Sequence, residues 1–227
     1  MRRAVLFDGA MSRMRKAGRL WRDVAARDAA ARVLVPPRAD CFVFEPRVWF
    51  GRAAGLELEL GAGRGDFIIE RAAAHPERDF IAVELDTQVA QLMAVRAGRR
   101  GLANLRILRV DARPLVNLML PAHGLNACHI YFPDPWPKGR HVKHRLFTPY
   151  FAESLTRVLA RDAPLHVATD VGDYAAAIFA MLEAAGFVRS AMAVPGATAT
   201  GFARKFIEAG REVYAATFVL PERSGSV

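Results

Sequence analysis

Acidic side chains gather where apolar segments of this sequence end. Glu84 and Asp86 follow one such segment, and Asp111, Asp134 and Asp170 follow three others. Carboxylates accept hydrogen bonds from hydroxyl, amino and ammonium groups. A set of them in one place could therefore bind a ligand that is rich in such donors. Whether they meet depends on the elements that position them.

Strand-like and helix-like segments alternate from residue 55 onward. Two strand-like segments close the sequence without a helix between them. The expected strands cover residues 55–61, 79–86, 104–112, 125–132, 164–170, 187–194 and 211–220. Such alternation predicts βαβ units and a parallel sheet covered by helices on both faces. We therefore expect an α/β fold, with a Rossmann-like, doubly wound, mostly parallel seven-stranded sheet and one antiparallel strand near the C-terminus. Ligands of such sheets bind at the carboxyl ends of the strands, where the acids above would meet.

A glycine-rich segment, ELGAGRGD, connects the first of these strands to a helix. Gly61, Gly63 and Gly65 permit a tight turn and let a ligand approach the backbone. In the dinucleotide fingerprint the last glycine stands one position later, and Asp66 occupies that position here. An acid at a helix N-terminus disfavours a pyrophosphate. The loop therefore indicates a ligand without a diphosphate.

Three carboxylates complement different parts of one ligand. Glu84 ends the second strand about 20 residues after the loop, where an acid accepts ribose hydroxyls. Asp111 ends the third strand and is placed to accept from an adenine amino group, and Glu59 suits an ammonium group. Together they predict S-adenosylmethionine as the cofactor. Taken singly, each acid could instead cap a helix or lie in a solvated turn.

The segment YFPDPWPKGRHVKHR, residues 131–145, places one acid among three prolines. A proline restricts the residue before it to extended conformations, so we expect residues 132–137 to be stiff and extended and to hold Asp134 in place. Trp136 could cover the site or stack on a base. The basic residues that follow suit phosphate groups; among them are Lys138, Arg140 and Lys143. The alternative is a proline-rich turn with a solvated basic surface.

The formal charge of +9 and the isoelectric point of about 10.3 favour a polyanionic partner such as nucleic acid. Abundant arginine and alanine could also reflect the codon bias of a GC-rich genome. No apolar run reaches the roughly 18 residues of a membrane span, and the N-terminus does not resemble a signal peptide. Cys41 and Cys128 are far apart in the sequence. We therefore expect a cytoplasmic protein without a membrane association.

Four segments resemble the bacterial tRNA (guanine-N7-)-methyltransferase family: LELGAGRGDF, FIAVELD, YFPDPWPKGRHVKHRLF and HVATDVGDYA. The resemblance extends over about residues 45–220. It implies a class I methyltransferase that uses S-adenosylmethionine to methylate N7 of a guanine in tRNA. It also implies that Glu59, Glu84 and Asp111 bind the cofactor, and that Asp134 is catalytic and close to it.

The same resemblance implies a set of substrate-binding residues. Lys138 and Asp170 match substrate-binding positions of the family, and Thr200 fits its late substrate motif. Ala203 stands where the family usually has a glutamate. With the phosphate-binding candidates Arg140 and Lys143, these residues form the expected contact with tRNA.

We divide the chain into a basic N-terminal arm (1–50), a methyltransferase domain (51–221) and a disordered tail (222–227), with no metal and no obligatory protein partner. One alternative is another class I nucleic-acid or protein amine methyltransferase. Some of these have an Asn/Asp-Pro-Pro-aromatic motif, whereas this chain has Pro-Asp-Pro-Trp. Another is a non-catalytic RNA-binding relative, which Ala203 favours. A nicotinamide dehydrogenase is disfavoured by Asp66.

Overall fold

The computed structural model describes residues 23–35, 44, 46–136, 143–196, 203 and 207–221. Three expected substrate residues, Lys138, Arg140 and Thr200, lie outside these ranges, as do most of the expected N-terminal arm and the tail after residue 221. In the part of the chain that is described, no helix is long and apolar enough to cross a membrane.

The described residues form one eight-stranded sheet with the order β1-β4-β3-β2-β5-β6-β8-β7. Its strands are β1 (Leu34–Val35), β2 (Leu56–Leu60), β3 (Asp79–Val83), β4 (Leu105–Leu108), β5 (Ala127–Tyr131), β6 (Leu165–Thr169), β7 (Val188–Ser190) and β8 (Tyr214–Val219). Neighbouring strands are parallel from β1 to β6, and β8 runs antiparallel to both β6 and β7. The predicted fold class, with one antiparallel strand near the C-terminus, is confirmed.

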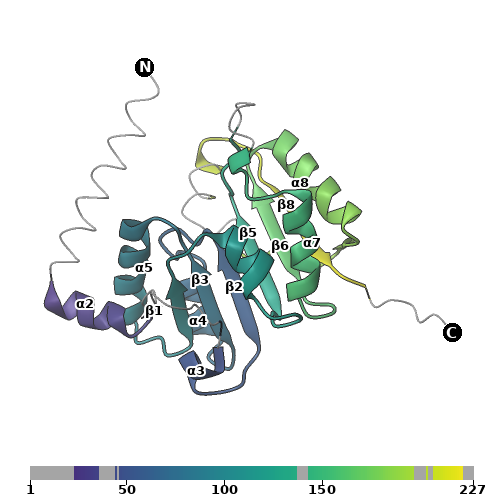
Figure 1. Cartoon of the computed structure of the whole chain (residues 1–227). Helices are drawn as coiled ribbons and strands as arrows, with labels where there is room; N and C mark the ends of the chain where they lie inside the picture. The colour runs from purple at the N-terminus through teal and green to yellow at the C-terminus, as the bar shows by residue number, and fades with distance from the viewer. Residues whose placement is uncertain are drawn as a thin grey trace.

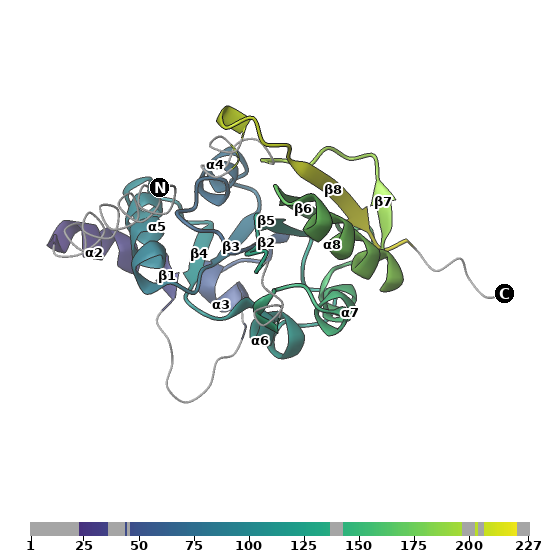
Figure 2. The same cartoon turned by 90° about the horizontal axis from the view of Figure 1, so that it is seen from above.

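Helices cover both faces of the sheet, as Figure 2 shows. They are α2 (Val24–Ala31), α3 (Pro46–Phe50), α4 (Ile68–Ala74), α5 (Thr87–Arg99), α6 (Ala112–Pro114), α7 (Pro149–Val158) and α8 (Gly172–Ala184), with a π-helix, η1 (Leu115–Met119), directly after α6. The buried side chains of α2, α4 and α5 form one core cluster, and those of η1, α7 and α8 form the other.

Local sequence explains where several helices begin. Asp86 caps α5 by accepting from the backbone N–H groups of Gln88 and Val89, and Thr148 caps α7 by accepting from that of Phe151. Short polar side chains at such positions satisfy amides that have no partner within the helix. Asp86 thus starts a helix at the edge of the sheet where the acids were expected to meet.

The sheet has eight strands rather than the seven expected, because residues 23–35 contribute a helix and a further strand that were not expected there. In this range α2 packs beside α5 (Figure 1), and β1 adds a parallel strand next to β4. The contact is very close: a Cβ atom at Gly98 of α5 would lie 2.0 Å from the carbonyl oxygen of Ala29. A two-residue strand and a short alanine-rich helix have little periodicity of their own, so only this packing identifies them.

Candidate functional site

A cleft of about 680 Å³ opens at the carboxyl ends of β2, β3, β4 and β5. The order of the strands reverses between β2 and β5, which is where open α/β sheets bind their ligands. Four carboxylates line the cleft, from Glu84, Asp86, Asp111 and Asp134. Three of the acids singled out in the sequence, Glu84, Asp111 and Asp134, therefore share one cavity, although they come from three different strand ends.

The glycine loop forms one wall of this cleft. Gly61 and Gly63 line it, with φ angles of 72° and 56°, in the left-handed region that favours glycine. A Cβ atom at either position would meet no atom within 4 Å, so the backbone is open to a ligand. Gly65 differs, because a Cβ there would lie 2.7 Å from Met93. Gly65 is required for packing against α5 and does not line the cleft.

Glu84 fastens the glycine loop to the end of β3. Its Oε2 accepts from the backbone N–H of Gly63 and its Oε1 from that of Asp86, each at 2.9 Å. Burial raises the pKa of Glu84. Each carboxylate oxygen has a second lone pair, so Glu84 can hold the loop and still accept from a bound ligand.

Asp111 has two roles at the end of β4. It caps α6 by accepting from the N–H of Arg113, and it forms an ion pair of 2.9 Å with the Arg113 guanidinium. Hydrogen bonds from Arg113 lower the pKa of Asp111. The helix-cap alternative is therefore correct for this residue. Asp111 also lines the cleft, so the cap does not exclude contact with a ligand.

Asp134 lies between two residues in an unfavourable backbone conformation. Phe132 and Trp136 have φ angles of 51° and 38°, although they were expected to be extended because each precedes a proline. Positive φ costs a residue with a Cβ about 1 to 3 kcal/mol, and such strain clusters at functional sites. The Nε–H of Arg145 bonds the carbonyl of Pro135 at 2.8 Å, which helps hold the segment. The side chain of Asp134 is exposed and makes no hydrogen bond or ion pair with the described residues, so it can accept from a ligand.

Glu59 is placed differently from the other predicted cofactor residues. It lies beneath the glycine loop, is 3% exposed and is not among the residues that line the cleft. Its Oε2 is buried without a hydrogen-bond partner in the described structure. Burial, with a smaller effect of Asp66 and Glu84, raises its pKa well above the usual range. A buried carboxyl group with an unused acceptor beside an acidic cleft is suited to a cationic ligand group.

The described substrate candidates lie outside the cleft. Asp170 follows β6 and forms an ion pair of 2.6 Å with Arg211, and Lys143 is exposed. The side chain of Ala203 is fully buried. Sequence reasoning missed Arg211, because nothing in its local pattern indicates that its partner is 41 residues away in the chain. It also missed Arg64 and Arg113, which line the cleft.

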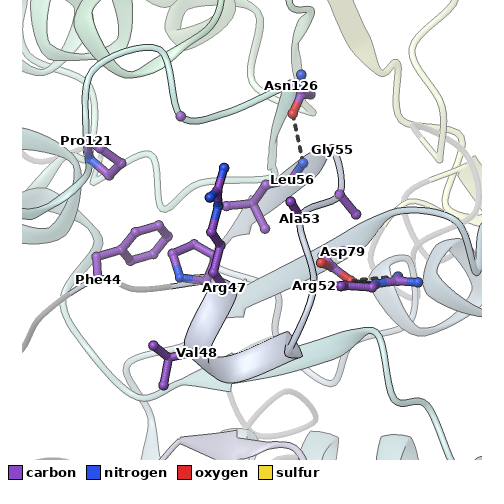
Figure 3. A pocket seen from close by; sticks show the side chains of 13 residues that line it. Phe44, Arg47, Val48, Arg52, Ala53, Gly55, Leu56, Asp79, Pro121 and Asn126 are labelled. Carbon is purple, nitrogen blue, oxygen red and sulfur yellow. Dashed lines mark hydrogen bonds and ion pairs between the residues drawn. The ribbon is translucent and has the colours of Figure 1, made fainter.

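A second pocket, of about 940 Å³, lies at the opposite edge of the sheet. It is formed around α3 and the amino ends of β2 and β3, as Figure 3 shows. Two of its polar side chains are already bound: Asn126 accepts from the backbone N–H of Leu56, and Arg52 pairs with Asp79. None of the predicted site residues lines it. The cleft at the carboxyl ends is therefore the candidate site.

Comparisons with known proteins agree with this geometry. Residues 54–216 match the model of a family described as "Putative methyltransferase". Proteins of Nitrosomonas eutropha and Halorhodospira halophila, both named tRNA (guanine-N(7)-)-methyltransferase, are 44% identical over 126 and 135 residues. These alignments cover 56% and 60% of this chain. The chain spans 56% and 58% of the length of these two relatives.

Solved structures show the same fold at low identity. The 16S rRNA methyltransferase KamB aligns with a TM-score of 0.59 and 18% identity, over 83% of this chain and 99% of its own. An S-adenosylmethionine-dependent methyltransferase of Aquifex aeolicus aligns with a TM-score of 0.52 and 15% identity, over 78% of this chain and 90% of its own. At these identities the similarity concerns the fold alone.

Proposed function

The chain belongs to the methyltransferase family whose model matches residues 54–216, and from this premise we propose that it transfers a methyl group from S-adenosylmethionine to N7 of a guanine in tRNA. The observation that carries the proposal is the shared cleft of Glu84, Asp111 and Asp134. The names of the relatives from Nitrosomonas and Halorhodospira support the choice of substrate. The proposal includes a cytoplasmic location, where tRNA is modified.

The residues present fit the proposed cofactor. S-adenosylmethionine supplies an activated methyl group on a positively charged sulfur. Among the residues that line the cleft, four carboxylates outnumber two arginines, Arg64 and Arg113, which suits a cationic ligand without a diphosphate. Glu84 would accept from the ribose hydroxyls and Asp111 from the adenine amino group, while Gly61 and Gly63 leave the backbone open. Glu59 would offer its unused oxygen to the ammonium group, which would favour its ionised form.

The proposed reaction requires little acid–base catalysis by the protein. Guanine N7 has a lone pair in the plane of the ring and no proton, so no general base is needed to activate it. What the protein must supply is alignment of N7 with the methyl group, and such positioning contributes up to about 7 to 11 kcal/mol. The strained and anchored segment around Asp134 is suited to this task.

Asp134 is the proposed catalytic residue. Its exposed carboxylate lies in the cleft and would accept from the guanine N1–H and 2-amino groups. Adenine lacks this pair of donors and would leave the acceptors unpaired, which costs affinity. Positive charge passes to the purine during the reaction, and a fixed carboxylate stabilises that charge.

Three basic side chains and one hydroxyl group are proposed to hold the substrate. Lys138, Arg140, Lys143 and Thr200 are the proposed tRNA contacts, and the net charge of +9 favours a polyanion. Lys143 is exposed, as a phosphate contact requires. The target base must leave its stack to reach a cleft of this size.

The decisive experiment is incubation with methyl-labelled S-adenosylmethionine and unmodified tRNA, followed by analysis of the labelled nucleoside. The expected product is N7-methylguanosine. Label on an adenosine, or on protein, would favour another class I methyltransferase. No transfer despite cofactor binding in a titration would favour a non-catalytic RNA-binding relative.

The same assay tests the role of Asp134. Asp134→Ala should lower the rate about 100- to 1,000-fold, the usual effect of removing one electrostatic group from a preorganised site. Its exposed side chain makes no hydrogen bond or ion pair with the described residues, so the fold should be retained. A rate close to that of the unsubstituted protein would refute the assignment.

A further inference from the structure

A buried polar network lies beneath the cleft and has no part in the proposed chemistry. Glu57 on β2 is fully buried and faces α4. Arg71 binds both oxygens of its carboxylate, and Arg78 binds Oε1 at 2.6 Å. On the other side, Nε2 of His129 lies 3.0 Å from Oε2. These partners hold the pKa of Glu57 well below its usual range against the effect of burial, so it is a carboxylate.

The network continues to the wall of the cleft. Nδ1 of His129 lies 3.0 Å from the hydroxyl oxygen of Tyr131, which lines the cleft. The Tyr131 hydroxyl donates to the carbonyl of Pro195 at 2.5 Å. Hydrogen-bonded groups therefore connect Arg71, on α4, to a turn in the loop after β7.

This turn, Val194–Gly196, is packed closely against the same residues. Gly196 has a φ angle of 76°, and a Cβ atom there would lie 2.2 Å from the ring of Phe67. The Phe67 ring in turn meets the Tyr131 ring edge to face, with 5.1 Å between centroids. Phe67 and Tyr131 thus hold the turn by shape, and the Tyr131 hydroxyl adds a directional bond.

The positions of the protons on His129 and Tyr131 follow from the groups in the network that can accept hydrogen bonds but cannot donate them. The Glu57 carboxylate and the Pro195 carbonyl have no proton to donate. Because Tyr131 gives its single proton to Pro195, Nδ1 of His129 must donate to the tyrosine oxygen, and Nε2 must donate to Glu57. Both ring nitrogens donate only in the imidazolium form. The arrangement is therefore complete only when His129 is charged.

We propose that Tyr131, which lines the cleft, is a positioning residue for tRNA, whose hydroxyl holds the turn Val194–Gly196 while His129 is doubly protonated. This inference rests on the proposed function, because the chain after Gly196 leads to Thr200, a proposed substrate contact four positions later. A turn that is already held loses less conformational entropy when tRNA binds.

A neutral His129 reverses its hydrogen bond with Tyr131 and thereby breaks the bond between Tyr131 and Pro195 that holds the turn. The ring keeps Nε2–H on Glu57 and presents the lone pair of Nδ1 to Tyr131, which then gives its proton to the histidine. Two oxygens without a proton between them are left facing each other at the Pro195 contact, and the turn is released. The hydrogen bond that holds the turn thus depends on protonation of His129, and low pH favours the conformation in which the turn is held.

Charged and titratable groups surround His129 on every side. Glu57 lies on β2, Arg71 on α4, Tyr131 on β5 itself, and His166 on β6 stacks on the ring with 5.0 Å between centroids. Burial lowers the pKa of His166 to about 3, so this neighbour is neutral. Burial also lowers the pKa of His129, and Glu57 opposes that shift.

The test compares Tyr131→Phe with Tyr174→Phe. Both rings are buried, but no hydrogen bond connects the hydroxyl of Tyr174 to the described residues of the turn. In Tyr131→Phe, amide hydrogen exchange of the peptide that covers residues 190–196 should rise about threefold to tenfold, the usual effect of one hydrogen bond. The KM for tRNA should rise by a similar factor, while the KM for S-adenosylmethionine stays constant. Tyr174→Phe should change neither quantity.

The pH dependence of the KM for tRNA distinguishes loss of the hydrogen bond between Tyr131 and Pro195 from a simple loss of packing. The ratio of the KM values for tRNA of Tyr131→Phe and the unsubstituted protein should be largest at the acid end of the histidine range, about pH 5 to 8. It should fall towards one as pH rises, because the unsubstituted protein then loses the same bond. A ratio that is constant over this range would overturn the role of His129.

Failure of this inference can be told from failure of the proposed function. Hydrogen exchange is measured without substrate. Equal exchange in the unsubstituted protein and in Tyr131→Phe would therefore show that the Tyr131 hydroxyl does not hold the turn, whether or not the protein is active. If the unsubstituted protein methylates no tRNA, the proposed function fails. The ratio of the exchange rates of the two proteins, measured from about pH 5 to 8, then still decides whether Tyr131 holds the turn.

Discussion

The contribution of the buried Glu57 carboxylate to stability can be tested with Glu57→Gln. The substitution keeps the size of the side chain but removes the charge that faces Arg71, Arg78 and His129. Removing one partner of a buried ion pair typically costs about 3 to 5 kcal/mol, because the other charge stays buried without compensation. Here the side chains of Arg71 and Arg78 are 19% and 45% exposed, so water compensates part of the loss. We therefore expect a cost near the lower limit, about 3 kcal/mol.

Thermal and urea unfolding, followed by circular dichroism, provide the measurement. For a chain of this length, about 3 kcal/mol corresponds to a fall in Tm of roughly 6 to 12 °C. Glu70→Gln is a matched control, since it removes the same charge from an exposed pair with Arg100. Exposed pairs contribute about 0 to 1 kcal/mol. If Glu57→Gln costs no more than this control, the burial of the Glu57 network contributes nothing to stability and our reasoning is refuted.

The effect of Glu57→Gln on the free energy of unfolding should depend on pH, and the lowered pKa of Glu57 determines the sign. The pKa of Glu57 is lower in the folded protein than its ordinary value of 4.5. A lowered carboxyl pKa stabilises the fold above the unfolded-state pKa, and this stability is lost as pH falls. The difference in unfolding free energy between Glu57→Gln and the unsubstituted protein should therefore shrink as pH falls below about 4.5. A difference that grows below this pH would contradict the assignment.

Two further substitutions test the site and the packing of α2. Glu84→Gln should weaken S-adenosylmethionine binding at least about tenfold in a calorimetric titration. An amide has only one oxygen, whereas the two carboxylate oxygens of Glu84 accept from the N–H groups of Gly63 and Asp86. An unchanged affinity would exclude a contact between Glu84 and the cofactor. Gly98→Ala should destabilise the protein by about 1 to 3 kcal/mol in urea unfolding, because its Cβ would meet the carbonyl oxygen of Ala29. Helix propensity alone would stabilise that variant by about 1 kcal/mol, so the sign of the change decides whether α2 packs on α5 as described.

Local sequence was sufficient for the parallel core of the fold and for the acids at its edge. The alternation of strands and helices depends on periodicity within each segment, and parallel strands bring their carboxyl ends to one edge. This is why Glu84, Asp111 and Asp134 could be expected in one cleft before their positions were known. The short elements α2 and β1 lack such periodicity, and the positive φ angles of Phe132 and Trp136 oppose the usual preference of a residue before proline.

What the sequence by itself determined is thus the order of the elements and the chemistry at the strand ends. The tertiary structure alone decided that Glu59 and Gly65 lie outside the cleft wall, that Asp170 pairs with Arg211, and that buried His129 connects Glu57 to Tyr131. Glu57 and His129 are 72 residues apart in the chain. Their contact depends on the pairing of β2 with β5, and a contact between strands so distant in sequence leaves no local pattern from which it could be predicted.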